Sequence, residues 1–281
     1  MDEQKIIATN LAKNYVIKER GLFGRKKKIV SAVKDISLEI PKGKIIGVLG
    51  INGAEKTTTI RMLASIIAPS SGTLTMNGVD AVKNHRWVKE RINVISGGER
   101  NLYWRLTAIE NLKYFGSLYG LSGVELKEKI AELLKIVGLV EAEDISVERY
   151  SKEMKQRLQI ARGLINDPEY IFLDEPTLGL DIVIAKEIRT MIKELAQEGK
   201  KGVLLTTHYI SEAEELCDYI YVLDKGRMIA QGTKEELKDL FASEPKMVLQ
   251  EPGLEEILMK IIYRSRGEDS EENIFGNKSR N

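Results

Sequence analysis

The chain has 281 residues, of which 43% are hydrophobic, so it can bury one substantial core or two modest lobes and is not disordered by composition. Lysine and arginine number 43 against 42 acidic residues, which leaves a net charge of +1 and no overall attraction to nucleic acid or acidic substrates. The start, Met1–Lys5, has no apolar signal core, and no apolar run approaches the roughly 20 residues that span a bilayer, so a cytoplasmic protein is expected. The single cysteine, Cys217, excludes an internal disulfide and a thiolate metal site, and we interpret it as a small buried hydrophobe.

Short apolar runs alternate with longer helical patterns, which predicts a mostly parallel sheet covered by helices. The runs expected to form strands are Ser37–Ile40, Lys44–Leu49, Thr73–Met76, Ile92–Ile95, Tyr170–Leu173, Gly202–Thr206 and Tyr219–Leu223. Helical periodicity dominates between about residues 86 and 165, which we interpret as a helical subdomain inserted into the sheet. Within it, one helix is expected to open at Glu110, and another, capped by Ser122, to run to Val137.

The end of the chain has a different pattern. Asp224–Arg227 has the two-residue turn and the flanking apolar residues of a hairpin. We expect one domain over residues 1–232 and a charged helical extension over 233–266. Residues 267–281 are rich in Gly, Ser, Asn and Glu and are expected to be disordered.

A glycine-rich segment follows the strand expected at Ile45–Leu49. It leads into the helical run Ile60–Ile67 through Gly50-Ile51-Asn52-Gly53-Ala54-Glu55-Lys56-Thr57-Thr58, the strand, loop and helix of a P-loop. In a P-loop, backbone N–H groups surround the phosphates, Lys56 would reach the outer phosphates, and Thr57 would bind Mg²⁺. Glu55 stands where the pattern has its last glycine, so an ordinary polar turn is the alternative for this segment alone.

The apolar run Tyr170–Leu173 ends in two adjacent carboxylates, Asp174 and Glu175. Successive strand residues point to opposite sides, so Asp174 can hold hydrated Mg²⁺ while Glu175 polarises an attacking water. The alternative for this segment alone is a buried strand that ends in solvated acids.

Two further segments carry candidate site residues, Ser151 and His208. Ser151 is expected to cap a helix. One face of that helix carries Met154, Leu158, Ala161 and Ile165. The strand expected at Leu204–Thr207 is followed directly by His208. A lone histidine after a strand is more often structural than catalytic.

The order of these segments resembles the ATP-binding subunits of ABC transporters over about residues 6–232. Leu11–Tyr15 is similar to the segment whose aromatic residue stacks on adenine, and Gly179–Asp181 is similar to the family's D-loop. A kinase or small GTPase would lack the signature helix followed closely by Leu-Asp-Glu-Pro. Soluble ABC proteins of translation or DNA repair typically carry paired modules or long coiled-coil insertions, which this chain lacks.

The resemblance implies an α/β fold: a P-loop NTPase core with a mostly parallel sheet, a small antiparallel β subdomain and an inserted α-helical subdomain. It also implies that two such subunits, in a homodimer or a heterodimer, hold ATP and Mg²⁺ between one P-loop and the partner's signature serine. Closure and hydrolysis would drive export through a separate membrane permease, with this chain peripheral on the inner face of the cell membrane.

The resemblance also implies residue roles. The nucleotide-binding residues would be Tyr15, Gly50, Asn52, Gly53, Ala54, Glu55, Lys56, Thr57 and Thr58. Ser151, Lys152 and Glu153 would contact the partner's ATP. Thr57 and Asp174 would hold Mg²⁺, Glu175 would activate water, His208 would sense the γ-phosphate, and Asp181 would lie in the D-loop.

Two glutamates depart from the family pattern, which has glycine at Glu55 and at Glu153. Each is at a predicted helix N-terminus, where the dipole and free N–H groups favour an anion, so a carboxylate could mimic the phosphate it excludes. At an effective dielectric of about 20, unit charges roughly 5 Å apart repel by about 3 kcal/mol, or about a hundredfold in ATP binding. The alternative is that each side chain turns into solvent and stabilises its helix by roughly 0.3–1 kcal/mol. The chain is thus either an impaired ATPase subunit or a non-hydrolysing regulatory or engineered one.

Three other segments leave alternatives open. The family's Mg²⁺-contacting glutamine falls at Gly98, and Glu99 is a candidate substitute. The basic stretch Lys18–Lys28 is interpreted as a solvated loop, with contact to anionic lipid headgroups as the alternative. Tyr103 and Trp104 are expected either in the core or, as family placement favours, in the groove that receives the membrane subunit.

Overall fold

A computed structural model describes residues 4–21, 24–97, 102–197 and 200–240. Within these residues, strands join into one mixed sheet in the order β5-β4-β1-β2-β10-β9-β3-β8-β7-β6. The strands are β1 (Lys5–Gly21), β2 (Gly24–Pro41), β3 (Ile45–Leu49), β4 (Ser71–Met76), β5 (Val79–Asp80), β6 (Ile92–Ser96), β7 (Tyr170–Asp174), β8 (Gly202–Thr207), β9 (Tyr219–Asp224) and β10 (Arg227–Gly232).

The central part of the sheet is parallel. Strands β6, β7, β8, β3 and β9 all run in one direction, which confirms the predicted fold class. Every residue of β3 and β8 is buried, because helices cover both faces, and this is why these strands read as continuous apolar runs. The predicted hairpin is also present, since β9 pairs antiparallel with β10 around Lys225 and Gly226, whose φ angles are +46° and +72°.

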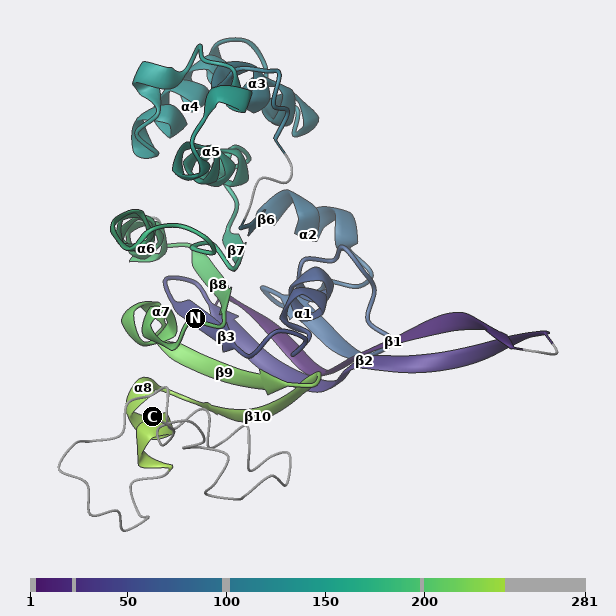
Figure 1. The fold of residues 1–281 in the computed structure, drawn as a ribbon. Helices are drawn as coiled ribbons and strands as arrows, with labels where there is room; N and C mark the ends of the chain where they lie inside the picture. The colour runs from purple at the N-terminus through teal and green to yellow at the C-terminus, as the bar shows by residue number, and fades with distance from the viewer. Residues whose placement is uncertain (1–3, 22–23, 98–101, 198–199, 241–281) are drawn as a thin grey trace, which may run out of the picture.

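The other part of the sheet is antiparallel and built mainly by the long hairpin of β1 and β2, which projects from the body of the protein (Figure 1). The prediction of a solvated loop over Lys18–Lys28 is therefore wrong for the described part of that stretch. The ladder pairs Tyr15 with Val30 and Val16 with Ile29, and it continues to the pairing of Gly21 with Gly24. Aromatic and β-branched pairs favour a strand ladder, and the basic composition beyond them masked that signal in the sequence.

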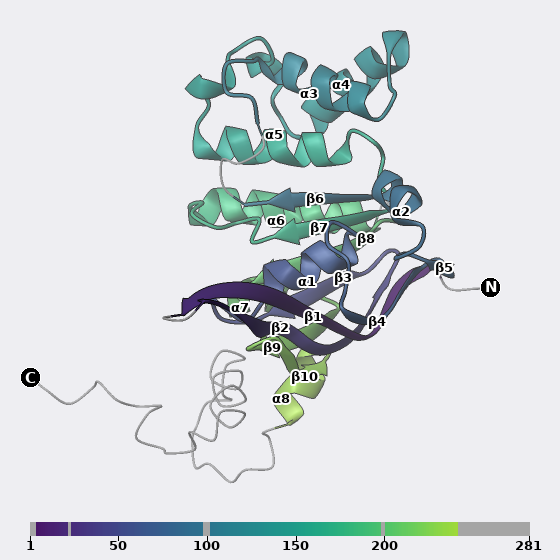
Figure 2. The same ribbon diagram turned by 90° about the vertical axis from the view of Figure 1, so that its right-hand side faces the viewer.

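The helices lie in two groups (Figures 1 and 2). Those against the sheet are α1 (Lys56–Leu63), α2 (His85–Arg91), α6 (Ile182–Gln197) and α7 (Ile210–Leu216). Those gathered at one end are α3 (Ala108–Leu118), α4 (Gly123–Ile136) and α5 (Lys152–Leu164), with the short 3-10 helices η1 (Val140–Ala142) and η2 (Val147–Arg149) between α4 and α5. None of the helices in the described ranges is long and apolar enough to cross a bilayer.

Local sequence signals explain where the helices of the second group begin. Thr107 and Glu110 form a reciprocal capping box at the start of α3. Ser122 is the N-cap residue of α4, but its hydroxyl makes no capping hydrogen bond. Strand β6 lies inside the block expected to be helical, because its apolar residues join the central sheet beside β7.

The C-terminal helix in the described part of the chain is α8 (Lys234–Asp239), within the expected extension over residues 233–266. A capping box joins Thr233 and Glu236 at its start. The expected tail over residues 267–281 lies outside the described residues.

Two large apolar clusters lie on opposite faces of the central sheet. Along β7, Ile171 and Leu173 belong to the cluster that includes α3 to α6, whereas Tyr170 and Phe172 belong to the cluster that includes α1 and the β1–β2 hairpin. Burial of one such side chain stabilises the fold by about 1.5–3 kcal/mol. The two clusters therefore hold the carboxyl ends of β3, β7 and β8 at one edge of the sheet, the edge where ligands bind in open α/β folds.

Cys217 follows α7 and is only half-buried as a residue, but its thiol is packed against the backbone of β3. A Cβ at Gly47 would lie 2.6 Å from the Cys217 sulfur. Burial raises the pKa of the Cys217 thiol, with Glu212 and Asp218 acting in the same direction. The interpretation of Cys217 as a small buried hydrophobe therefore holds for its thiol.

Candidate functional site

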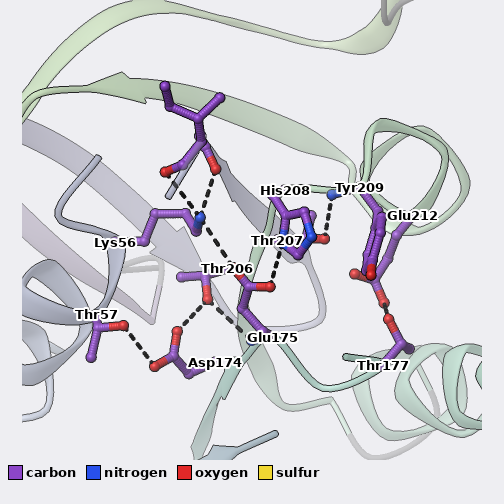
Figure 3. A network of polar contacts seen from close by, with 12 residues as sticks. Lys56, Thr57, Asp174, Glu175, Thr177, Thr206, Thr207, His208, Tyr209 and Glu212 are labelled. Atoms are coloured by element: carbon purple, nitrogen blue, oxygen red, sulfur yellow. Dashed lines mark hydrogen bonds and ion pairs between the residues drawn. The ribbon is translucent and has the colours of Figure 1, made fainter. Parts of the chain in front are cut away.

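The candidate site lies where β3, β7 and β8 end side by side (Figure 3). After β3, residues 50–55 lead into α1; after β7 comes Glu175; and after β8 comes His208. The structure therefore brings three of the four ordered sequence segments into one polar network.

Glu55 is the N-cap residue of α1 and adopts a left-handed backbone conformation, with φ +70° and ψ +27°. Such a conformation costs a residue other than glycine about 1–2 kcal/mol. The side chain is half-buried, and its Oε2 accepts a hydrogen bond of 2.6 Å from the Thr58 hydroxyl. The carboxylate thus bonds to the first turn of α1, as a helix-stabilising side chain would, and it is only partly exposed to solvent.

Lys56 is almost completely buried, with 6% of its surface exposed. Its ammonium donates to the Gly50 carbonyl at 2.6 Å and to the Ile51 carbonyl at 3.4 Å, and lies 3.1 Å from Glu175 Oε1. The amine expected to bind phosphate is thus held by the loop and by the expected base. A phosphate that approaches Lys56 must exchange with the Glu175 carboxylate.

Thr57 and Asp174, the side chains expected to bind Mg²⁺, lie within hydrogen-bond distance of each other. The Thr57 hydroxyl donates to Asp174 Oδ2 at 2.9 Å, and the Thr206 hydroxyl donates to Asp174 Oδ1 at 2.6 Å. Mg²⁺ prefers hard oxygen ligands and usually binds one or two carboxylates together with waters and substrate phosphates. This pair of side chains fits that preference, and within the described residues no larger group of acidic, histidine and cysteine side chains could hold a metal.

Glu175 occupies a constrained position at the end of β7. Its φ is +54°, and its backbone N–H donates to the Thr206 carbonyl at 3.1 Å and to the Thr206 hydroxyl at 3.2 Å. Its Oε2 lies 2.5 Å from His208 Nδ1. A Cβ at Gly97 would lie 2.1 Å from the Glu175 carbonyl oxygen, so only glycine fits there without moving Glu175.

The other expected site residues lie outside this network. Ser151 is the N-cap residue of α5 and accepts a hydrogen bond of 3.2 Å from the Met154 N–H, as predicted. Asp181 accepts a bond of 3.0 Å from the Ile184 N–H before α6. Tyr15 is exposed on the β1–β2 hairpin, with Lys13 Nζ 5.4 Å from its ring centroid.

Glu153 and its neighbour Lys152 lie in the first turn of α5, next to Ser151. Hydrogen bonds from the Ser151 hydroxyl and from its own N–H hold the pKa of Glu153 below its usual range, although Asp181 acts against them. The carboxylate is therefore charged at neutral pH and remains near the helix N-terminus.

Tyr103 and Trp104 are exposed, so the alternative that places them in the core is wrong. The Tyr103 ring contacts Tyr114 with centroids 4.8 Å apart, and Lys155 Nζ lies 4.8 Å from the Trp104 ring centroid. Gly98 and Glu99, the candidate positions for the family's glutamine, lie outside the described residues.

Several residues of the network had no role in the sequence-based prediction. Thr206 links Asp174 to Glu175, Gly97 makes room for Glu175, and Glu212 on α7 is buried beside Thr177. The sequence did contain a signal for Thr206. It is the first of two threonines that end an otherwise apolar strand just before His208. The sequence holds no comparable signal for Gly97 or Glu212.

Burial raises the pKa of the Glu212 carboxyl above its usual range, with hydroxyls of Thr207 and Thr177 and the charge of Arg189 acting against this and Glu175 adding to it. Stability from such a group is fully present below the unfolded pKa of about 4.3 and is lost as pH rises through the folded value. Glu212→Gln, which does not titrate, should therefore gain stability relative to the native chain as pH rises above the unfolded pKa of about 4.3. Urea unfolding over a series of pH values tests this, and a stability difference independent of pH would contradict it.

Comparison with known proteins places this geometry among nucleotide-binding subunits. The family model described as ABC transporter matches residues 33–178. The ABC transporter ATP-binding protein NatA of Bacillus subtilis is 46% identical over 222 residues, which cover 79% of this chain and 90% of that protein. The Nod factor export ATP-binding protein I of Cupriavidus metallidurans is 41% identical over 207 residues, which cover 74% of this chain and 68% of that protein.

Solved structures show the same arrangement of elements. The dimeric structure of a post-hydrolysis state of the ATP-binding cassette MJ0796, bound to ADP and Pi, matches with a TM-score of 0.70 and 25% identity. The match covers 81% of this chain and 98% of that one. The mixed sheet and helices described above are thus those of a P-loop NTPase of this family.

Proposed function

Because the chain belongs to the ABC transporter family of ATP-binding proteins, we propose that it couples Mg-ATP binding and hydrolysis to export through a separate membrane permease. A relative named for export supports the direction of transport. Residues 1–232 would form the ATP-binding domain, with α3 to α5 as its helical subdomain and residues 233–266 as an extension. The chain would act on the cytoplasmic face of the membrane.

The network at the ends of β7 and β8 carries this proposal. In it, Lys56 binds the outer phosphates once it exchanges Glu175 for nucleotide, and Gly50, Asn52, Gly53, Ala54 and Thr58 surround the phosphates. The exchange leaves Glu175 Oε1 free to accept a proton from the attacking water. His208 Nδ1, 2.5 Å from the other oxygen, holds the carboxylate in position.

The remaining expected residues would complete the nucleotide site. Thr57 and Asp174 would hold Mg²⁺, which supplies charge neutralisation at the transferred phosphoryl group. Tyr15 would stack on adenine. Ser151 and Lys152 at the exposed start of α5 would meet ATP bound to a second subunit, and Asp181 would lie at the same interface. The dimeric state of the MJ0796 cassette supports this arrangement.

Glu55 and Glu153 would impair this function at two different steps. Glu55 already occupies the Thr58 hydroxyl, so its carboxylate would oppose phosphate within the same subunit. Glu153 would oppose the phosphates bound to the partner subunit. In a homodimer, each nucleotide would therefore face one glutamate from each subunit.

The proposal is tested by assaying the chain carrying both Glu55→Gly and Glu153→Gly with its permease. Binding and hydrolysis of Mg-ATP are the expected results, and a chain that does neither would overturn the proposal. The alternative function is that of a non-hydrolysing regulatory subunit, which the Glu55–Thr58 bond favours. Micromolar ATP affinity of the unaltered chain would exclude that alternative.

The exposed aromatic residues Tyr103 and Trp104 are proposed to line the groove that receives the permease. They lie where α3 begins, in the group of helices gathered at one end of the protein. Replacing Trp104 with alanine should weaken co-purification with the permease without changing nucleotide affinity. If co-purification is unchanged, Tyr103 and Trp104 do not contact the permease and only pack against neighbouring side chains.

The β1–β2 hairpin is proposed to contact anionic lipid headgroups. Val16 and Ile29, a cross-strand pair, have 60% and 69% of their surfaces exposed, and Lys27 and Lys28 next to them are exposed as well. A lysine near an anionic surface contributes about 1 kcal/mol, so the double change Lys27→Glu and Lys28→Glu should lower vesicle affinity more than about tenfold. The matched control is Lys127→Glu with Lys135→Glu on α4. Equal binding to neutral and anionic vesicles would contradict the contact.

A further inference from the structure

A buried carboxylate on α7 lies behind the candidate site. Only 2% of the surface of Glu212 is exposed. Its Oε1 accepts a hydrogen bond of 2.8 Å from the Thr177 hydroxyl (Figure 3). Its Oε2 is buried, and none of the described residues forms a geometrically sound hydrogen bond with it.

Glu212 contacts the chain segment that carries Glu175. Thr177 follows Glu175 by two residues, in a turn closed by the bond from the Leu178 N–H to the Glu175 carbonyl at 3.2 Å. Thr207 directly precedes His208, and its hydroxyl accepts a bond of 2.9 Å from the Tyr209 N–H. Both threonine side chains are buried.

The position of Glu212 is costly for stability. A buried polar atom without a hydrogen bond costs about 1–3 kcal/mol. The pKa of the Glu212 carboxyl is raised first by burial, with the nearby Glu175 acting in the same direction. The bond from the Thr177 hydroxyl to Glu212 nevertheless fixes the Thr177 side chain, which an apolar residue of similar size at position 212 would not do.

We propose that Glu212 is a positioning residue, which holds Thr177 through the bond to its hydroxyl so that the Glu175 carboxylate meets the His208 imidazole at the ends of β7 and β8. The inference rests on the proposed ATPase function, in which Glu175 accepts a proton from the attacking water and His208 holds the Glu175 carboxylate in position. Glu212 itself touches neither the water nor the nucleotide. Its effect passes through the turn that joins Thr177 to Glu175, two residues earlier in the chain.

The kinetic test uses the chain that carries Glu55→Gly and Glu153→Gly. Glu212→Leu should lower kcat by about 10- to 100-fold, the usual effect of losing a supporting residue, and leave KM for ATP unchanged because the P-loop is untouched. Glu212→Gln keeps an oxygen for Thr177 and should retain most of kcat. Thr177→Val should lower kcat as Glu212→Leu does, and the double variant should be no worse than either single one. The matched control is Glu214→Leu on the same helix, whose carboxylate pairs with Lys234 and Lys238 of α8.

A second test needs no turnover and uses the unaltered chain. Its two histidines, His85 and His208, give separate imidazole resonances in NMR spectra. Glu212→Leu should shift the His208 resonances, Glu212→Gln should leave them nearly in place, and those of the exposed His85 on α2 should not move with either change. Unchanged His208 resonances in Glu212→Leu, or equal shifts in both variants, would overturn the inference. If the glycine-restored chain proves inactive, the proposed function fails, and this test still decides the role of Glu212.

Discussion

In the chain that carries Glu55→Gly and Glu153→Gly, the further change Glu175→Gln is expected to lower kcat for ATP hydrolysis by about 10²–10⁴-fold, the usual contribution of a general base. The amide has no oxygen that can accept a proton from water. Nucleotide affinity should rise rather than fall, because the ion pair of 3.1 Å between Lys56 and Glu175 is lost and the ammonium becomes available to phosphate. The prediction is measured by steady-state hydrolysis together with nucleotide titration of the same protein.

The control for this prediction is Glu132→Gln, a change of the same chemistry on the exposed face of α4. It should alter neither kcat nor affinity. A loss of turnover below about threefold in Glu175→Gln would contradict the role of Glu175, since it would supply less than about 1 kcal/mol to the barrier. Reduced nucleotide affinity would contradict the exchange of Glu175 for phosphate at Lys56.

The second prediction with a large expected effect distinguishes the role of Glu55 from that of Glu153. Glu55→Gly alone is expected to raise the ATP affinity of the monomer by about a hundredfold, because a carboxylate roughly 5 Å from phosphate opposes it by about 3 kcal/mol. Glu153→Gly alone should leave monomer affinity unchanged, because Glu153 lies on α5, outside the network of the P-loop. Its effect should appear only in ATP-dependent dimerisation of chains that also carry Glu55→Gly. Calorimetric titration and sedimentation measure the two steps separately.

The control for the comparison of Glu55→Gly with Glu153→Gly is the free energy of unfolding of the Glu55→Gly variant. Glu55→Gly relieves the left-handed backbone strain of about 1–2 kcal/mol. It also removes the hydrogen bond to Thr58, which contributes about 0.5–1.5 kcal/mol. Since the two effects oppose each other, the free energy of unfolding should change by less than about 1 kcal/mol. An equal gain in monomer affinity from Glu55→Gly and Glu153→Gly would contradict the assignment of the two glutamates to different subunits of the dimer.

Much of the central fold could be predicted from the sequence because its signals are local and consistent. The strands β3, β7, β8 and β9 read as apolar runs, since each is buried on both faces. The turn at Lys225–Gly226 was indicated by the apolar residues on both sides of it, and the structure gives both turn residues positive φ angles. The extended β1–β2 hairpin could not be predicted in the same way. Its outer part is held together by pairing of the two backbones, and the residues there are mostly basic. The sequence of that part therefore lacks the alternation of apolar and polar residues that usually indicates a strand.

The sequence motifs predicted which residues lie at the candidate site, but not which of their side chains contact one another. The order of the segments places Lys56, Asp174, Glu175 and His208 at the ends of neighbouring strands, where the structure brings them together. The pairing of Lys56 with Glu175, and the bond from Thr58 to Glu55, depend on side-chain rotamers that a linear pattern does not contain. The position of Glu212 depends on the packing of α7 against β3 and β8, which only the assembled fold defines.

The most direct measurement is an equilibrium titration of the unaltered chain with Mg-ATP, beside the variant Glu55→Gly. The bond between Glu55 and Thr58 predicts weak binding by the unaltered chain and saturation of the variant at concentrations about a hundredfold lower. Micromolar affinity in the unaltered chain, equal to that of the variant, would show that the Glu55 carboxylate moves away from the phosphates, and would contradict the obstruction of the nucleotide site.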